Sequence, residues 1–116
     1  DAMALLTMLE IDGIEPERST PNPANVLEGA PVFRTWSVEE RPDGLAAGLW
    51  EATPGKWRFV SDCWEYCRIR SGLSIITEDG GAARRVGPGD AVILQEGFTG
   101  TWEVVETTLK DYVVKT

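Results

Sequence analysis

Apolar and polar residues alternate along most of the chain in short runs, a pattern typical of β-strands. From residue 32 onward, runs rich in Val, Ile, Trp, Thr and Tyr are interrupted by Gly, Pro or Asp. Short strands with turn residues at regular spacing indicate a sandwich or barrel. The expected strands are Val32–Val38, Leu45–Ala52, Lys56–Val60, Trp64–Arg70, Leu73–Thr77, Arg84–Val86, Ala91–Leu94, Thr101–Val105 and Leu109–Lys115.

Two turns between these runs are well defined. Asp-Gly and Gly-Gly pairs in Glu78–Gly81 supply the positive φ angles of a tight hairpin, and Gly87–Asp90 provides a similar turn before Ala91. Successive hairpins without helical periodicity favour an antiparallel sheet that curls to hide its edges. We therefore predict an all-β fold, an antiparallel β-sandwich or jelly-roll barrel, over residues 32–116.

The first 31 residues have a different composition. Pro16, Pro21, Pro23 and Pro31 stand among Ser, Thr and Asn, which favours an extended arm over a packed element. We expect residues 1–31 to wrap a surface of the barrel or of a partner subunit. The apolar spacing in Met3–Ile11 fits either a short helix or an edge strand, and both remain open.

Composition and charge exclude several classes of protein. The net charge is −8 and the pI is near 4.5, with Lys and Arg scattered along the chain, so nucleic acid is not an expected partner. No apolar run is long enough to span a membrane. The first residues lack the features of a secretory signal, and we expect a cytoplasmic protein.

The two cysteines, Cys63 and Cys67, do not form a zinc motif by themselves. The chain has no histidine, so carboxylates would have to complete a tetrahedral site. Four residues apart on one strand, their Cα atoms would be separated by about 13 Å, which is beyond the reach of a disulfide. We interpret both as thiols that are buried or half-buried.

Two glycine-containing segments carry a resemblance to a known family. Glu65 is followed by six residues and then Gly72, after a front Pro54-Gly55, and Gly89–Gly100 forms a second segment. This part of the chain resembles the two motifs of the cupin family, in particular small single-domain cupins related to ureidoglycine aminohydrolase and the ethanolamine-utilisation cupin. The resemblance covers roughly residues 45 to 115 and implies a cupin barrel.

The resemblance departs from the family pattern at the metal ligands. Cupins commonly hold a metal with histidines, and here those positions fall on Phe59, Ser61 or Cys63 and on Gly100. Only Glu65 remains as a possible ligand. Transition metals of this kind favour imidazole, so we predict no metal and no cofactor.

Within a cupin barrel, Glu65, Cys67 and Ile69 are expected to point inward. The resemblance places a lysine in the final strand, at Lys110, and Glu65 keeps a position of the first motif. These two are the candidate catalytic residues, because a buried carboxylate can act as acid or base and a buried lysine as base or anion anchor. The candidate ligand-binding residues are Trp50, Ser61, Gly100, Trp102 and Tyr112.

The leading functional hypothesis is a metal-independent cupin domain that binds a small polar molecule inside the barrel. One alternative is an enzyme acting on a small molecule, as a lyase, an isomerase or an aminohydrolase-like protein. The other is a structural or regulatory protein without catalysis. The resemblance further implies a homodimer, because cupins commonly pair through their outer sheets.

Overall fold

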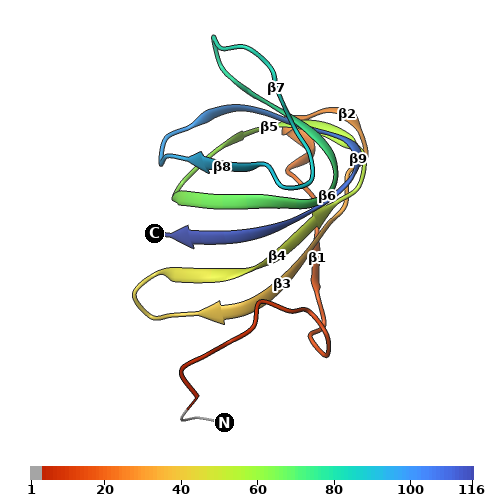
Figure 1. The fold of residues 1–116 in the computed structure, drawn as a ribbon. Coiled ribbons are helices and arrows are strands. Elements are labelled where there is room, and N and C mark those ends of the chain that lie inside the picture. The colour runs from red at the N-terminus through yellow and green to blue at the C-terminus, as the bar shows by residue number, and fades with distance from the viewer. Residues whose placement is uncertain (1–3) are drawn as a thin grey trace.

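Two long antiparallel strands, β6 (Trp64–Glu78) and β9 (Thr99–Lys115), run side by side through the whole molecule. The other strands are added on either side of this pair, and the sheet curls around an interior (Figure 1). Strand β9 also pairs with β4 (Leu45–Ala52) and β5 (Gly55–Val60). Every strand pairing is antiparallel, so the predicted all-β barrel or sandwich is confirmed.

The computed structural model describes residues 4–116. Its remaining elements are β1 (Glu17–Ser19), a 3₁₀ turn η1 (Pro23–Asn25), β2 (Val26–Gly29), β3 (Phe33–Glu40), β7 (Arg84–Val86) and β8 (Ala91–Leu94). Within residues 4–116 there is no α-helix, and hence no helix long and apolar enough to cross a membrane.

Four strands predicted separately turn out to be two. The expected strands Trp64–Arg70 and Leu73–Thr77 are joined in β6, and Thr101–Val105 and Leu109–Lys115 are joined in β9. The pairing register shifts between Ile69 and Ser74, where Gly72 has a φ of +91°. A β-bulge bends a strand without ending it, so the glycine that indicated a break marks a bend.

The bend also changes which residues of β6 face the interior. Before it the odd-numbered Cys67 and Ile69 are buried, and after it the even-numbered Ser74 and Ile76 are buried. The inward orientation predicted for residues 65, 67 and 69 is thus confirmed for the first half of the strand. An added residue at a bulge reverses the alternation of faces, which sequence parity alone does not reveal.

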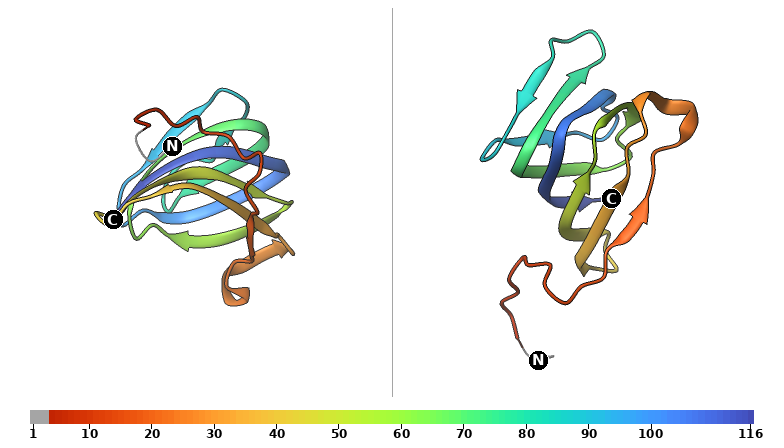
Figure 2. Two further views of the ribbon diagram at one scale, coloured as in Figure 1. Left: turned by 90° about the horizontal axis from the view of Figure 1, so that it is seen from below. Right: turned by 90° about the vertical axis from the view of Figure 1, so that its right-hand side faces the viewer.

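The N-terminal arm is tied to the barrel by two short strands. Strand β1 pairs with β3, and β2 pairs with β5 (Figures 1 and 2). Residues 4–11 form neither the helix nor the strand considered for them, and Met3 lies outside the described residues. Arg70, on the outer face of β6, donates a 3.0 Å hydrogen bond to the carbonyl of Leu9 and pairs with Asp111.

The interior is filled largely by aromatic and aliphatic side chains. Trp57, Ile69, Trp102 and Val104 are each at most 5% exposed. Further aromatic rings pack against this core, and the centroids of rings in contact are 4.9 to 6.4 Å apart. Trp57 and Trp102 therefore point into the barrel, and Trp50 packs against them.

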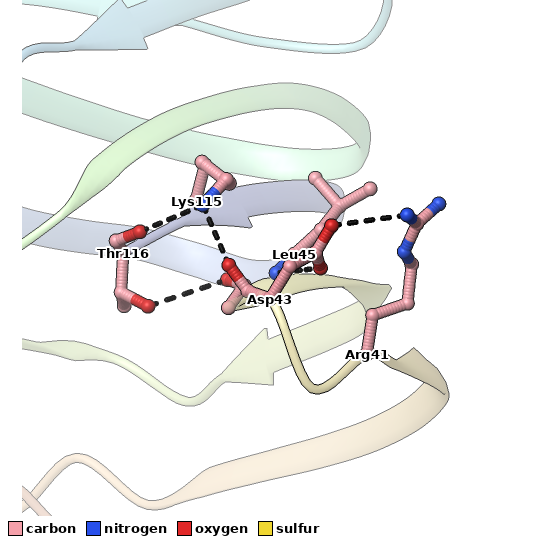
Figure 3. A network of polar contacts seen from close by, with 6 residues as sticks. Arg41, Asp43, Leu45, Lys115 and Thr116 are labelled. Carbon is pink, nitrogen blue, oxygen red and sulfur yellow. Dashed lines mark hydrogen bonds and ion pairs between the residues drawn. The ribbon is translucent and has the colours of Figure 1, made fainter.

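At one end of the barrel the β3–β4 turn is fastened to the C-terminus by exposed polar contacts (Figure 3). Lys115 Nζ donates to the carbonyls of Asp43, at 2.6 Å, and Thr116, at 2.9 Å. The backbone N–H of Leu45 donates to the Asp43 carboxylate, and this bond, together with Arg41, lowers the pKa of Asp43. Lys115 is therefore a surface lysine whose partners are mostly backbone.

Candidate functional site

Glu65 and Lys110 form an ion pair inside the barrel. Their strands, β6 and β9, are neighbours, and both side chains lie on the inner face. Lys110 Nζ lies 2.8 Å from Glu65 Oε2, and the two side chains are 8% and 17% exposed. The two candidate catalytic residues predicted from the sequence are therefore in direct contact.

The ammonium of Lys110 also contacts two tryptophan rings. Its Nζ lies 4.4 Å from the ring centroid of Trp50 and 4.5 Å from that of Trp102. The negative face of an indole ring attracts a cation at this distance. The ammonium is therefore enclosed by one carboxylate and two ring faces.

Opposing effects act on the pKa of Lys110. Burial lowers this pKa because it penalises the charged form, whereas Glu65, Cys67 and Tyr112 raise it by stabilising that form. The net shift is upward, so Lys110 is a protonated ammonium at neutral pH. In this state it can donate a hydrogen bond or a proton, but it cannot act as a base.

The ion pair borders a cavity of about 150 Å³ that is open to the surface. Most of its wall is aromatic, and Glu65 and Lys110 are its charged residues. The lining residues are Phe33, Trp50, Trp57, Phe59, Glu65, Leu94, Trp102 and Lys110. A mostly aromatic pocket with a few convergent polar groups is the usual form of a small-molecule site.

A buried hydrogen-bond network holds Trp102 in the cavity wall. The indole Nε1–H of Trp102 donates to Ser74 Oγ at 3.0 Å. Ser74 Oγ lies 2.7 Å from Thr108 Oγ1, which donates to the carbonyl of Glu106 at 2.9 Å. Ser74 and Thr108 are fully buried, so these bonds fix the ring orientation without solvent competition.

Of the predicted ligand-binding residues, Trp50 and Trp102 line the cavity, and the other three lie elsewhere. Tyr112 packs between Gly48 and Cys67, its nearest neighbours on the adjacent strands, and burial raises its pKa. Ser61 lies in the β5–β6 turn, where its backbone N–H donates to the carbonyl of Phe98 at 2.8 Å.

Gly100 is part of strand β9, between Phe59 on β5 and Glu78 on β6. An added Cβ would lie 2.1 Å from the carbonyl oxygen of Thr77. The absence of a side chain thus lets two strands approach closely. A role of Gly100, Ser61 or Tyr112 in ligand binding stays a prediction.

Two cavity residues, Phe33 and Leu94, were not singled out from the sequence, and Phe59 was noted only as a position on which a histidine of the family pattern falls. Phe59 follows Trp57 by two positions in an expected strand, so alternation could have placed both side chains on one face. For Phe33 and Leu94 there was no such signal, because their approach to the site depends on how distant strands pair. Phe33 belongs to β3 and Leu94 to β8, on different sides of the β6–β9 pair.

The residues of this interior do not fit the metal that cupins commonly hold. Within residues 4–116 no three His, Cys, Asp or Glu side chains come together as a metal site would require. The carboxylate of Glu65 is engaged by the ammonium of Lys110. Cys67 is a free, buried thiol, and burial raises its pKa to about 11, which disfavours the thiolate that binds metals.

Several solved structures share this fold. A protein of unknown function from Pseudomonas syringae pv. tomato strain DC3000 superposes with a TM-score of 0.79 at 25% identity, covering 99% of this chain and 46% of that one. The EutQ protein of Clostridium difficile gives 0.66 at 18% identity, with coverages of 83% and 66%. A putative ethanolamine utilization protein of Salmonella typhimurium gives 0.64 at 13% identity, with coverages of 88% and 96%.

These similarities show the fold, and the chain spans less than two thirds of the length of the first two proteins. A search of curated proteins finds no significant match. The model of the EutQ-like cupin domain matches residues 39–112, which include β4 to β8, most of β9 and both segments that carried the resemblance. The chain therefore belongs to the EutQ-like cupin family.

Proposed function

We propose that this chain is a metal-independent cupin domain that binds a small polar molecule inside the barrel, at the Glu65–Lys110 pair. The observation that carries the proposal is that this ion pair, buried in the core, forms part of the wall of an open cavity. The small molecule would contact the pair and the ring faces of Trp50 and Trp102.

The energetics of buried charges support a functional role for the pair. Removing two charges from water costs several kcal/mol per ion, and a well-packed apolar pair is often about as stable. A residue in a cleft whose pKa is shifted by burial and by a specific charge partner, as that of Lys110 is, is a candidate for a functional site. The raised pKa of Lys110 supplies an ammonium next to a carboxylate, a combination suited to a polar ligand.

Direct binding measurements test the proposal. Metal-stripped protein is screened against a library of small polar molecules, with tryptophan fluorescence as the signal, since Trp50 and Trp102 line the cavity. Calorimetry then gives the affinity of each hit for the wild type and for Glu65→Gln and Lys110→Met. The control is Lys115→Met, which makes the same substitution at an exposed position of the same strand.

The expected result is a hit whose affinity changes at least tenfold in either cavity variant and stays unchanged in the control. A tenfold change corresponds to about 1.4 kcal/mol, less than the usual value of one charged hydrogen bond. Hits whose affinities are the same in all variants would overturn the proposal, as would a complete absence of hits.

We also propose that the chain forms a homodimer through the outer face of the sheet. The register places Ala47, Val113, Tyr66 and Ile93 in one row across β4, β9, β6 and β8. These residues alternate with inward-facing ones, and Ile93 is 55% exposed. In the neighbouring row Arg68 lies opposite Asp111, which forms an ion pair with Arg70, so a second copy related by a two-fold axis could offer a carboxylate to Arg68.

Light scattering coupled to gel filtration tests this interface. We expect a dimer mass for the wild type, a monomer mass for Ile93→Glu, and a dimer mass for the control Val60→Glu, which alters an exposed aliphatic residue on β5. A wild type that is monomeric at high micromolar concentration would contradict the homodimer.

A further inference from the structure

The aromatic rings and the carboxylate of the cavity both favour a positively charged ligand. Five of its eight lining residues are aromatic, namely Phe33, Trp50, Trp57, Phe59 and Trp102. The faces of such rings are negative and attract cations, most strongly when water is excluded. Glu65 adds a full negative charge and is the more exposed member of the ion pair, at 17% against 8% for Lys110.

The hydrogen-bonding capacity of the Glu65–Lys110 pair also favours a cationic ligand. One N–H of Lys110 is used by Glu65 Oε2, and the ammonium also faces the rings of Trp50 and Trp102. A lysine has only three N–H groups, so little donor capacity is left for a ligand. In the described part of the chain, the carboxylate of Glu65 has no hydrogen-bond partner except Lys110, and its Oε1 can accept from a ligand.

We infer that the cavity selects a small organic cation of the alkylammonium or amidinium class, held by the ring faces and by Glu65. This inference rests on the function proposed above and adds the class of the ligand. Lys110 shows that the arrangement suits such a group, because its own side chain is an alkylammonium seated between two rings and a carboxylate.

The charge of Lys110 does not reverse this preference. Its ammonium is in contact with the Glu65 carboxylate at 2.8 Å, so the pair as a whole is neutral. A cation therefore meets a neutral pair and a wall with five aromatic residues, of which Trp50 and Trp102 present ring faces to an ammonium. An anion of the same size would be repelled by those faces.

The volume of the cavity limits the size of the cation. The cavity volume of about 150 Å³ is below the roughly 300–1,000 Å³ of pockets that hold drug-sized ligands, so only a small molecule fits. Choline is a suitable probe, because it has a compact quaternary ammonium and a hydroxyl that can donate to Glu65 Oε1.

Three probes of similar shape and different charge provide the test. They are choline, the neutral alcohol in which carbon replaces the nitrogen of choline, and the tert-butylacetate anion. Calorimetry with the full chain is expected to show choline binding at least about tenfold more tightly than the alcohol, because only choline makes cation–π contacts in the desolvated site. The anion is expected to bind more weakly than either.

The variant Lys110→Met distinguishes a cationic ligand from an anionic one. The variant leaves Glu65 without an internal cation, so it should bind choline at least about tenfold more tightly than the wild type does. If Lys110 instead recognises an anion, the variant should lose binding of that anion. Phe33→Leu, which removes one ring and no charge, should weaken choline severalfold, and it provides the test if Lys110→Met does not fold. Lys115→Met is the control and should leave all three affinities unchanged.

The outcomes distinguish this inference from the proposed function. Preferential binding of the anion, equal binding of choline and the alcohol, or weaker choline binding by Lys110→Met would overturn the cation class. The cavity would then still be a binding site if the library screen yields ligands sensitive to Glu65 and Lys110. If neither the probes nor the library bind, both the inference and the proposed function fail.

Discussion

Lys110 and Glu65 form a salt bridge of 2.8 Å, but their environments differ, because Lys110 is sealed by Trp50 and Trp102 while Glu65 is the more exposed partner. Glu65→Gln leaves a deeply buried ammonium without a counter-charge, whereas Lys110→Met leaves a carboxylate that water can reach. Breaking a buried pair costs about 3–5 kcal/mol. We expect Glu65→Gln to approach that cost and Lys110→Met to lower the free energy of unfolding by less.

Urea unfolding of both single variants and of the double variant measures this difference. The double variant removes both charges, so it should be more stable than Glu65→Gln alone. Equal losses in the two single variants would contradict the predicted difference between them, and additive losses in the double variant would show that the two charges do not depend on each other in the folded barrel.

The alternation of apolar and polar residues predicted much of the strand content, but it did not predict how the strands pair. The bounds expected for Leu45–Ala52, Arg84–Val86 and Ala91–Leu94 are those of β4, β7 and β8. Each of these strands ends at Gly, Pro or other turn residues that are visible in the sequence. The continuous β6 was missed because Gly72 is equally compatible with a loop and with a bulge.

The candidate site was predicted in part for a related reason. Glu65 and Lys110 were identified through the family motifs, and their contact follows from the pairing of β6 with β9. Phe33 reaches the same cavity only because β3 pairs with β4 and the sheet then curls. Curvature and cross-strand register are properties of the assembled sheet, so a single strand's sequence does not reveal them.

Ser74 is expected to stabilise the barrel by satisfying the indole N–H of Trp102. Ser74→Ala leaves that buried donor, and the hydroxyl of Thr108, with one partner fewer. An unsatisfied buried polar group costs about 1–3 kcal/mol, and we expect a loss of this size in urea unfolding. Ser71→Ala, at an exposed position of the same strand, is the control and should change stability by less than about 0.5 kcal/mol. A loss in Ser74→Ala no larger than in this control would contradict the network.

Gly100 is expected to be intolerant of any side chain. In Gly100→Ala the new methyl group would meet the carbonyl oxygen of Thr77 in the neighbouring strand, at 2.1 Å before relaxation. Overpacking of this kind costs about 1–3 kcal/mol, or more where backbone has to move. At Gly87 the nearest atom would be 3.9 Å away, so Gly87→Ala should be tolerated. Thermal unfolding of both variants measures the difference, and similar midpoints would show that β9 can shift to make room.

The buried thiol of Cys67 makes the stability of the domain depend on pH in the alkaline range. Burial raises its pKa from the ordinary value of 9.0 to about 11, so the folded chain keeps a proton that the unfolded chain loses in this interval. The stabilisation is complete below pH 9 and is lost as the pH rises to about 11. At about 1.4 kcal/mol per pKa unit, the free energy of unfolding should fall by about 3 kcal/mol from this group alone.

Lys110 and Tyr112 also have raised pKa values and act in the same direction, so the variant Cys67→Ala is needed to isolate the thiol. Urea unfolding at pH 8, 9, 10 and 11 should show a decline that is shallower in Cys67→Ala than in the wild type by roughly the amount above. Cys63→Ala is the control, because Cys63 is only half-buried and its removal should change the slope much less. Parallel declines in Cys67→Ala and the wild type would mean that the thiol ionises as easily in the folded barrel as in the unfolded chain, and that Lys110 and Tyr112 account for the alkaline loss.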